Sequence, residues 1–195
     1  MEPLISVKEL KIIYNEGKDN EFVALNGIDI DIFPEEYIIF FGPSGCGKST
    51  LLYTIMGLQP ASKGRVLIKG QDSSAFSEKE KSNVASHFYG VIFQNFNLIY
   101  SLSVFDNVAL PQVFINATKK DRTPKTAEMV KRFGIEKQQH KLPNTLSGGQ
   151  QQRVAISRAL INDPAVILAD EPVGYLDSES AQVVMETLKE IHRTD

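Results

Sequence analysis

The sequence Gly-Pro-Ser-Gly-Cys-Gly-Lys-Ser-Thr at residues 42–50 has the residue types and the spacing of a phosphate-binding loop. It lies between an apolar run, residues 37–41, and a helix that we predict over residues 48–56. Glycines let backbone N–H groups close around phosphate oxygens, and the positive end of the following helix adds to the attraction. Lys48 would reach the β- and γ-phosphates, and Ser49 would offer its hydroxyl to Mg²⁺. The alternative is a glycine-rich turn that only caps a helix.

A second candidate segment is the apolar run Ala165–Ala169, which ends in two carboxylates, Asp170 and Glu171. A carboxylate at the tip of a buried strand beside a phosphate loop can hold Mg²⁺, directly or through water, and Asp170 suits that role. Hydrolysis also needs a base that orients an attacking water and accepts its proton, and we assign this role to Glu171. An apolar run ending in two acids is a weak signal alone, but it becomes strong together with the phosphate loop.

The segment Leu146–Gln150, Leu-Ser-Gly-Gly-Gln, predicts a second anion site. Ser147 can cap a helix, and the two glycines that follow let backbone N–H groups and the helix dipole act on an anion. Helix capping alone needs only one such residue. A chain with one complete phosphate site has no use for a second unless it binds another nucleotide, including one held by a neighbouring copy.

These segments together resemble the nucleotide-binding subunit of an ABC transporter. The Walker A motif matches Gly42–Thr50, the signature motif matches Leu146–Gln150 with its continuation to Leu160, and Walker B matches Val166–Glu171. The resemblance covers nearly the whole chain. Three further segments are most similar to the group of lipoprotein-release, macrolide-export and cell-division ATPases: Gly90–Leu98, Asn107–Pro111 and Ala169–Asp177.

The resemblance implies ATP and Mg²⁺ as cofactors and assigns further roles. Gln94 matches the Q-loop glutamine, which touches Mg²⁺ or the attacking water, although a lone glutamine at a strand end can also be merely structural. Tyr14 matches the aromatic residue that stacks on adenine, with core packing as the alternative. Cys46 is a small loop filler rather than an oxidation target. The expected catalytic residues are Glu171 and Gln94. The expected metal ligands are Ser49, Gln94 and Asp170. The expected nucleotide contacts are Tyr14, Gly42, Ser44, Gly45, Cys46, Gly47, Lys48, Ser49, Thr50, Ser147, Gly148, Gly149, Gln150 and Asp177.

The same resemblance implies partners. The signature residues would contact ATP held by a second copy, which gives a head-to-tail dimer with two ATPs, and Asp177 would connect the two sites across the interface. An integral membrane permease would bind this dimer at the inner face of the cell membrane, with the chain itself cytoplasmic and peripheral. The alternatives are a module that dimerises on ATP with little turnover, and a soluble ABC ATPase outside transport. Cargo, direction of transport and the identity of the permease are not encoded in these motifs.

The elements that must position these residues indicate an α/β fold of the P-loop NTPase class. We expect a mostly parallel sheet core, an antiparallel β portion near the N-terminus and an inserted helical subdomain. Residues 1–94 and 161–195 would form the nucleotide-binding core of a single domain, and residues 95–160 the helical subdomain. The strands and helices expected are residues 4–14, 22–32, 37–41, 65–69, 89–93 and 165–169, and residues 48–56, 103–114 with an interruption at Pro111, 124–133, 149–160 and 178–192.

Composition agrees with this interpretation. The chain has 195 residues, 42% hydrophobic and 23% charged, as in an ordinary globular domain. Its net charge of −3 gives no electrostatic reason to expect nucleic acid as a partner. Cys46 is the only cysteine, which excludes a disulfide framework and a cysteine-based zinc site. The apolar runs are far shorter than the ~18 residues of a membrane span, and no signal peptide pattern is present.

Some positions depart from the family pattern. Val173 and Tyr175 replace the usual threonine and asparagine, which we interpret as family drift. The family continues after the D-loop helix with an apolar strand that ends in Thr-His, whereas this sequence stops at Asp195. None of His87, His140 and His192 can take the place of that histidine. We therefore expect a C-terminally incomplete domain, unpaired backbone on the neighbours of the absent strand, and impaired hydrolysis.

Overall fold

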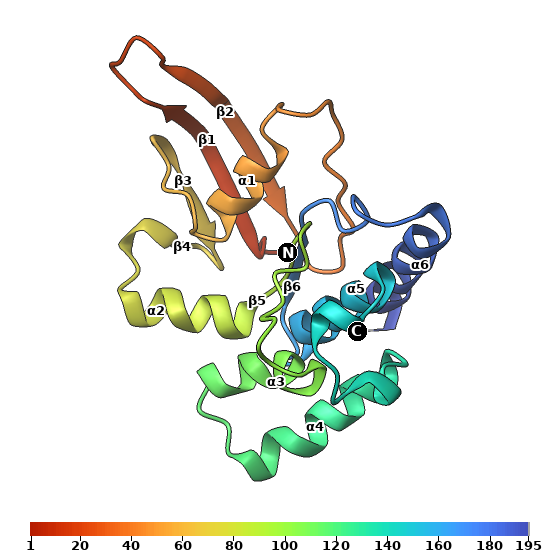
Figure 1. Ribbon diagram of the computed structural model, residues 1–195. Coiled ribbons are helices and arrows are strands. Elements are labelled where there is room, and N and C mark those ends of the chain that lie inside the picture. Colours follow the sequence, from red (N-terminus) through yellow and green to blue (C-terminus); the bar gives the residue numbers. More distant parts are fainter. Residues whose placement is uncertain (195) are drawn as a thin grey trace. The chain divides into compact units, whose positions relative to one another are not determined.

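The computed structural model describes residues 1–194 and divides into two compact units, Met1–Lys81 and Ser82–Asp195. The first unit holds a four-stranded antiparallel sheet, and the second holds a two-stranded parallel sheet with helices packed around it (Figure 1). The expected α/β class, with an antiparallel portion near the N-terminus and a parallel sheet, is therefore confirmed. None of the helices described is long and apolar enough to cross a membrane.

The antiparallel sheet has the strand order β2-β1-β3-β4. Its first strand buries Ile5, Val7, Leu10 and Ile12, and this spacing shifts by one residue where the pairing register shifts between Val7 and Leu10. The helix α1 then starts at Lys48 and ends before Gly57, whose φ of 76° is the left-handed value that ends helices. The elements of this unit are β1 Ile5–Tyr14, β2 Phe22–Ile32, α1 Lys48–Ile55, β3 Lys63–Ile68, β4 Gln71–Asp72 and the short helix η1 Ser73–Ala75, with α2 Glu78–Asn83 at the boundary.

In the second unit, β5 and β6 pair in parallel, with Tyr89 opposite Val166 and Ile92 opposite Ala169. The helix α5 lies so close to β5 that a Cβ on Gly90 would stand 2.5 Å from the carbonyl oxygen of Ala159. The elements are η2 Val84–Phe88, β5 Tyr89–Ile92, α3 Val104–Phe114, α4 Lys119–Arg132, η3 Glu136–Gln138, η4 Pro143–Thr145, α5 Gly148–Leu160, β6 Val166–Ala169 and α6 Ser178–Thr194.

The hydrophobic core of the second unit is built from β5 and the faces of the helices that turn inward. Its fully buried members are Ile92, Val104, Val108, Ile135, Val154, Ala155, Ile156 and Ile161. The core packs α5 between the strands and the other helices, so that residues on α5 have a fixed position relative to the ends of β5 and β6.

The prediction of a buried strand at Tyr37–Phe41 is wrong. These residues have no regular structure, and Ile39 and Phe41 are 67% and 98% exposed. A parallel strand is stable when neighbouring strands take its N–H and C=O groups. In residues 1–194, no strand pairs with this segment. Apolar character alone therefore did not make it a strand.

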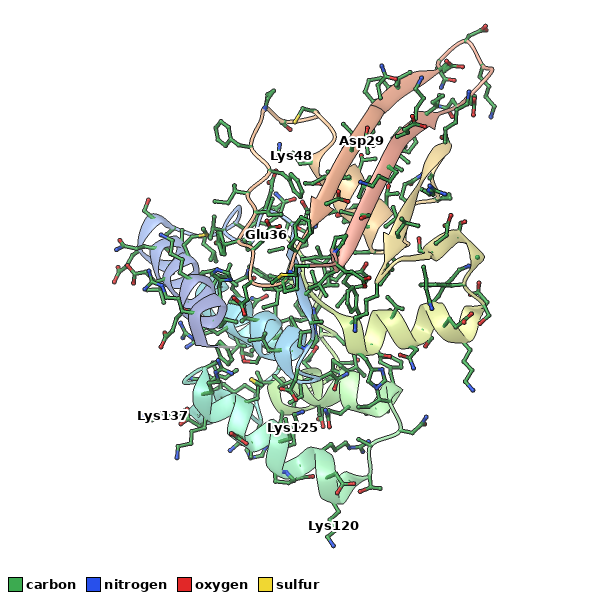
Figure 2. All side chains as sticks on the ribbon, turned by 180° about the vertical axis from the view of Figure 1, so that it is seen from behind. Asp29, Glu36, Lys48, Lys120, Lys125 and Lys137 are labelled. Carbon is green, nitrogen blue, oxygen red and sulfur yellow. The ribbon has the colours of Figure 1, made fainter. Side chains whose placement is uncertain are left out.

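Two helix predictions need smaller corrections. Pro111 does not interrupt α3, which continues to Phe114. The helix α4 begins at Lys119 and not at Pro124, because the hydroxyl of Thr118 accepts a hydrogen bond from the N–H of Asp121 and caps the helix earlier. The charged start of α4 is exposed, and Lys120 points away from the helix in Figure 2.

Candidate nucleotide-binding site

The phosphate loop of the first unit holds its lysine inward. The ammonium of Lys48, which is labelled in Figure 2, donates hydrogen bonds of 2.9 Å to the carbonyl oxygens of both Gly42 and Pro43. Both carbonyl oxygens are uncharged acceptors. Phosphate oxygens carry full charge and attract an ammonium more strongly. Lys48 is therefore held where an incoming polyphosphate can take it over.

Glycine is required at the junction of this loop with α1. Gly47 has a φ of 97°, which residues other than glycine rarely adopt. A Cβ at this position would stand 2.7 Å from the Cδ2 atom of Leu25 and 2.8 Å from the carbonyl oxygen of Ala24. The close approach anchors the start of α1 on β2, so that the helix N-terminus and its positive dipole end face the loop.

Tyr14 lies on the same unit, at the end of β1, and its side chain is 37% exposed. It stands opposite Phe22 in the ladder, and Phe22 is two residues from Ala24 along β2. Because a strand advances ~3.3 Å per residue, Tyr14 lies within about 7 Å along the strand of the contact made by Gly47. Exposure of the ring leaves a face that a base can stack on, and it argues against core packing.

In the second unit, Gln94 and Glu171 meet at the carboxyl ends of the two parallel strands. The Gln94 side chain amide donates a 2.6 Å hydrogen bond to the Glu171 carboxylate. Asp170 precedes Glu171, is only 4% exposed, and its N–H continues the ladder by bonding to the carbonyl oxygen of Ile92. Ligands of open α/β sheets bind at the carboxyl ends of strands, which is where these side chains lie.

The turn that carries Glu171 is strained. Glu171 has a φ of 43°, and its carbonyl oxygen accepts a 2.9 Å hydrogen bond from the N–H of Gly174. Left-handed backbone at a residue other than glycine or asparagine is uncommon and gathers at functional sites. A Cβ on Gly174 would stand 3.1 Å from the Gln94 amide nitrogen and 3.4 Å from the Glu171 carboxylate. The glycine thus leaves room for the pair.

The signature segment begins α5 with a capping box. The Ser147 hydroxyl accepts from the N–H of Gln150, and the Gln150 side chain accepts from the N–H of Ser147. Built Cβ atoms on Gly148 and Gly149 would lie 3.3 Å from Leu176 and 3.1 Å from Ser180. The two glycines therefore place the N-terminus of α5 directly against the segment that follows Walker B.

Asp177 lies in that segment and caps α6. Its carboxylate accepts hydrogen bonds from the N–H and the hydroxyl of Ser180, at 2.9 and 2.8 Å. These bonds favour the charged form and hold the pKa of Asp177 below its ordinary value. The structure therefore brings Asp177 and the signature glycines together through Ser180.

Sequence reasoning did not find two residues of α5 that contact these segments. The Gln152 amide donates a 2.6 Å hydrogen bond to the carbonyl oxygen of Pro172, next to Glu171. The Arg158 guanidinium donates to the carbonyl oxygens of Phe96 and Asn97, which follow Gln94. A polar residue on the buried face of an amphipathic helix was the one signal in the sequence for Gln152.

Comparison with known proteins places this site in a family. Residues 25–174 match the family model described as ABC transporter. The chain belongs to the ABC transporter family and is similar to its ATP-binding subunits. The ABC transporter ATP-binding protein YtrE of Bacillus subtilis is 42% identical over 93% of this chain and 78% of its own length. An uncharacterized ABC transporter ATP-binding protein of Thermotoga maritima is 39% identical over 98% of this chain and 82% of its own length.

The macrolide export ATP-binding/permease protein MacB of Mannheimia succiniciproducens is 38% identical over 97% of this chain, which spans 29% of that protein. Among solved structures, the dimeric ABC transporter cassette MJ0796 is 36% identical, with a TM-score of 0.87 over 97% of this chain and 83% of its own. A second MJ0796 structure, a post-hydrolysis state bound to ADP and Pi, has a TM-score of 0.86 at 35% identity. The expected family and the expected group are confirmed.

Proposed function

We propose that this chain binds and hydrolyses ATP with Mg²⁺, and that Glu171 is the base of the reaction. The observation that carries the proposal is the 2.6 Å hydrogen bond between the Gln94 amide and one Glu171 carboxylate oxygen. This bond orients the carboxylate and leaves its other oxygen to accept a proton from an attacking water. The Gln94 amide oxygen is an acceptor, which suits contact with that water or with Mg²⁺.

The nucleotide contacts that we propose are divided by chemistry. Lys48, now on two backbone carbonyls, transfers its hydrogen bonds to the β- and γ-phosphates, and the backbone of residues 42–50 surrounds them. Tyr14 stacks on adenine. Ser49, Asp170 and Gln94 supply a hydroxyl, a carboxylate and an amide oxygen, the hard ligands that Mg²⁺ takes in nucleotide sites. When bound, Mg²⁺ neutralises charge on the phosphates.

We further propose that two copies form a head-to-tail dimer around two ATPs. The capping box and the glycines at 148 and 149 keep the start of α5 narrow, so that N–H groups there can approach a γ-phosphate held by the other copy. The dimeric cassette MJ0796 supports this assembly. Within it, residues 1–94 and 161–195 would form the nucleotide-binding core and residues 95–160 the helical subdomain.

A membrane permease is the partner that we propose for the dimer. MacB, by its name, unites an ATP-binding and a permease part, and this chain aligns with a portion of it. Closure on ATP and opening after hydrolysis would transmit motion to such a permease at the inner face of the membrane, because the closed dimer prefers ATP over ADP.

Two variants with matched controls test the function. Glu171→Gln should lower kcat by ~10²–10⁴-fold and keep ATP affinity, because it removes the base and leaves the phosphate loop intact. Lys48→Ala should weaken ATP binding by ~10–100-fold through the loss of a charge-assisted contact. Glu128→Gln and Lys120→Ala, exposed on α4, should change neither.

The measurements are fluorescent nucleotide binding, phosphate release and light scattering with and without ATP. Glu171→Gln should also accumulate as an ATP-bound dimer, since the ATP that closes it is not consumed. If the unmodified chain forms dimers with ATP but releases no phosphate, the chain is a module that binds ATP and not a hydrolase. ATP affinity unchanged by Lys48→Ala would exclude the proposed phosphate site.

A further inference from the structure

The helix α5 contacts the Walker B turn through the side chain of Gln152. A gain in folding stability does not explain why this polar side chain is buried. Gln152 is 0% exposed, and its amide nitrogen donates a 2.6 Å hydrogen bond to the carbonyl oxygen of Pro172, the residue after Glu171. Its amide oxygen is also buried and accepts no hydrogen bond from any donor in residues 1–194. A half-satisfied buried amide is less favourable than an apolar side chain of the same shape. What Gln152 contributes is therefore its hydrogen bond to the turn.

The same helix contacts the segment that follows Gln94. The Arg158 guanidinium donates to the carbonyl oxygen of Asn97 at 2.6 Å and to that of Phe96 at 2.7 Å. Phe96 and Asn97 have φ values of 57° and 47°, so that two successive residues other than glycine stand in the left-handed region. A planar fork with two donors can hold such a backbone in place, whereas a lysine cannot match both carbonyls rigidly.

The Arg158 side chain is partly buried. Burial lowers the pKa of its guanidinium, and no ion pair found in the described part of the chain includes it. The two backbone carbonyls that accept from this guanidinium belong to the segment that carries Gln94.

We infer that α5 is the positioning element of the water-activating pair: Gln152 fixes the turn of Glu171, and Arg158 fixes the segment of Gln94. This inference rests on the proposed roles of Glu171 and Gln94 in hydrolysis. The two supported segments are joined to each other by the 2.6 Å bond between the pair and by the ladder of β5 and β6. The helix that supports both begins at the capping box of Ser147, so the signature segment and the supports of the pair belong to one helix.

The first test separates positioning from stability. Gln152→Leu removes the donor to the turn together with the unsatisfied oxygen. We expect kcat to fall about tenfold, as for other supports of catalytic groups, with ATP affinity within about twofold of the original and an unchanged or raised Tm. Gln71→Leu, on exposed β4, is the matched control and should leave kcat unchanged. If the kcat of Gln152→Leu equals that of the unmodified chain, the inference is overturned.

Arg158→Lys keeps the positive charge but loses the planar guanidinium that donates to both carbonyls. We expect kcat to fall by about tenfold, again at constant ATP affinity. Arg193→Lys, exposed on α6, is its control. If Gln152→Leu does not fold, this conservative variant carries the test. A lower ATP affinity at constant kcat in Arg158→Lys would mean a binding role and would overturn the inference.

A double-mutant cycle shows through which group α5 acts. If Gln152 acts by placing Glu171, then Gln152→Leu should have no further effect on the residual turnover of Glu171→Gln. Equal tenfold effects in both backgrounds overturn the inference while leaving the proposed function in place. A Glu171→Gln variant with full turnover refutes the proposed function instead, so that the two failures are distinguishable.

Discussion

Two runs of equal length, residues 37–41 and 165–169, are both entirely apolar and have different structures. Most of the second run forms β6, pairs in parallel with β5, and buries Leu168 at 5% exposure. The first has no regular structure and leaves Phe41 98% exposed. Each run leads into a segment of the candidate site. The difference shows that an apolar run becomes a parallel strand where another strand satisfies its backbone, and not because of its composition.

The segments that follow the two runs are also built differently. The side-chain hydrogen bonds of Lys48 in the phosphate loop are local, to carbonyls five and six residues away, and Gly47 adds a close approach to β2. The turn at Glu171 is held by side chains from distant parts of the chain, with Gln94 lying 77 residues away. The loop therefore keeps its shape although the run before it is exposed, whereas the turn depends on the packing of the strand and helix around it.

The largest difference between the runs should appear in stability. Leu168→Ala removes a buried side chain from β6 and should lower the free energy of unfolding by about 3 kcal/mol. Phe41→Ala removes a larger side chain that is exposed, and should change it by less than ~0.5 kcal/mol. Urea unfolding of both variants measures this. Equal losses would show that residues 37–41 are buried in solution and would abolish the contrast.

The next largest effect should come from the backbone of the phosphate loop. Gly47→Ala combines a φ of 97° with contacts below 3 Å to Leu25 and Ala24, so the junction with α1 must move. Strain of about 1–3 kcal/mol at such a position corresponds to a loss of ATP affinity of about 5- to 150-fold. Gly57→Ala is the control, because Gly57 has a φ of 76° and no atom beyond its chain neighbours lies within 4 Å of the position that a Cβ would take. This variant therefore has the backbone strain without the steric clash. It should lose stability and keep ATP affinity, as nucleotide titration will show.

A smaller effect is expected where the turn leaves room for the pair. Gly174→Ala places a methyl group 3.1 Å from the Gln94 amide and 3.4 Å from the Glu171 carboxylate. The backbone carbonyl oxygen of Glu171, also at 3.4 Å, is in ordinary contact, so mainly the Gln94 amide must give way. We therefore expect kcat to fall about three- to tenfold with stability and ATP affinity unchanged. Steady-state phosphate release and nucleotide titration measure the two quantities. A change in affinity without one in kcat would place Gly174 outside the catalytic turn.

The sequence predicts well what is local and poorly what depends on partners. The hairpin of β1 and β2, the end of α1 at Gly57 and the cap at Ser147 follow from short patterns, and the structure has them. The exposure of residues 37–41 could not be predicted, because a pairing strand is not a property of the run itself. The roles of Gln152 and Arg158 were missed for the same reason: their partners lie 20 and more than 60 residues away along the chain.

The smallest effect that we predict concerns the end of the Walker B turn, at Asp177. Ser180→Ala removes the hydroxyl that donates to the carboxylate and keeps the N–H that does the same, so the pKa of Asp177 should rise only partly toward its ordinary value. At Asp72 the hydroxyl of Ser74 is the largest cause of the lowered pKa, so Ser74→Ala should bring that pKa nearer to normal. Carboxyl NMR titration of both variants measures the two rises, and each variant is the control for the other.

The sign of the accompanying stability change follows from the lowered pKa of Asp177. Since the folded chain favours the ionised carboxylate, the stabilisation is fully present above the ordinary aspartate pKa and disappears as the pH falls through the lowered one. Ser180→Ala should therefore be less stable than the original chain at neutral pH, and the difference should vanish in acid. A difference that persists below both pKa values would mean that Ser180 stabilises α6 by packing against Gly149 and not by capping through Asp177.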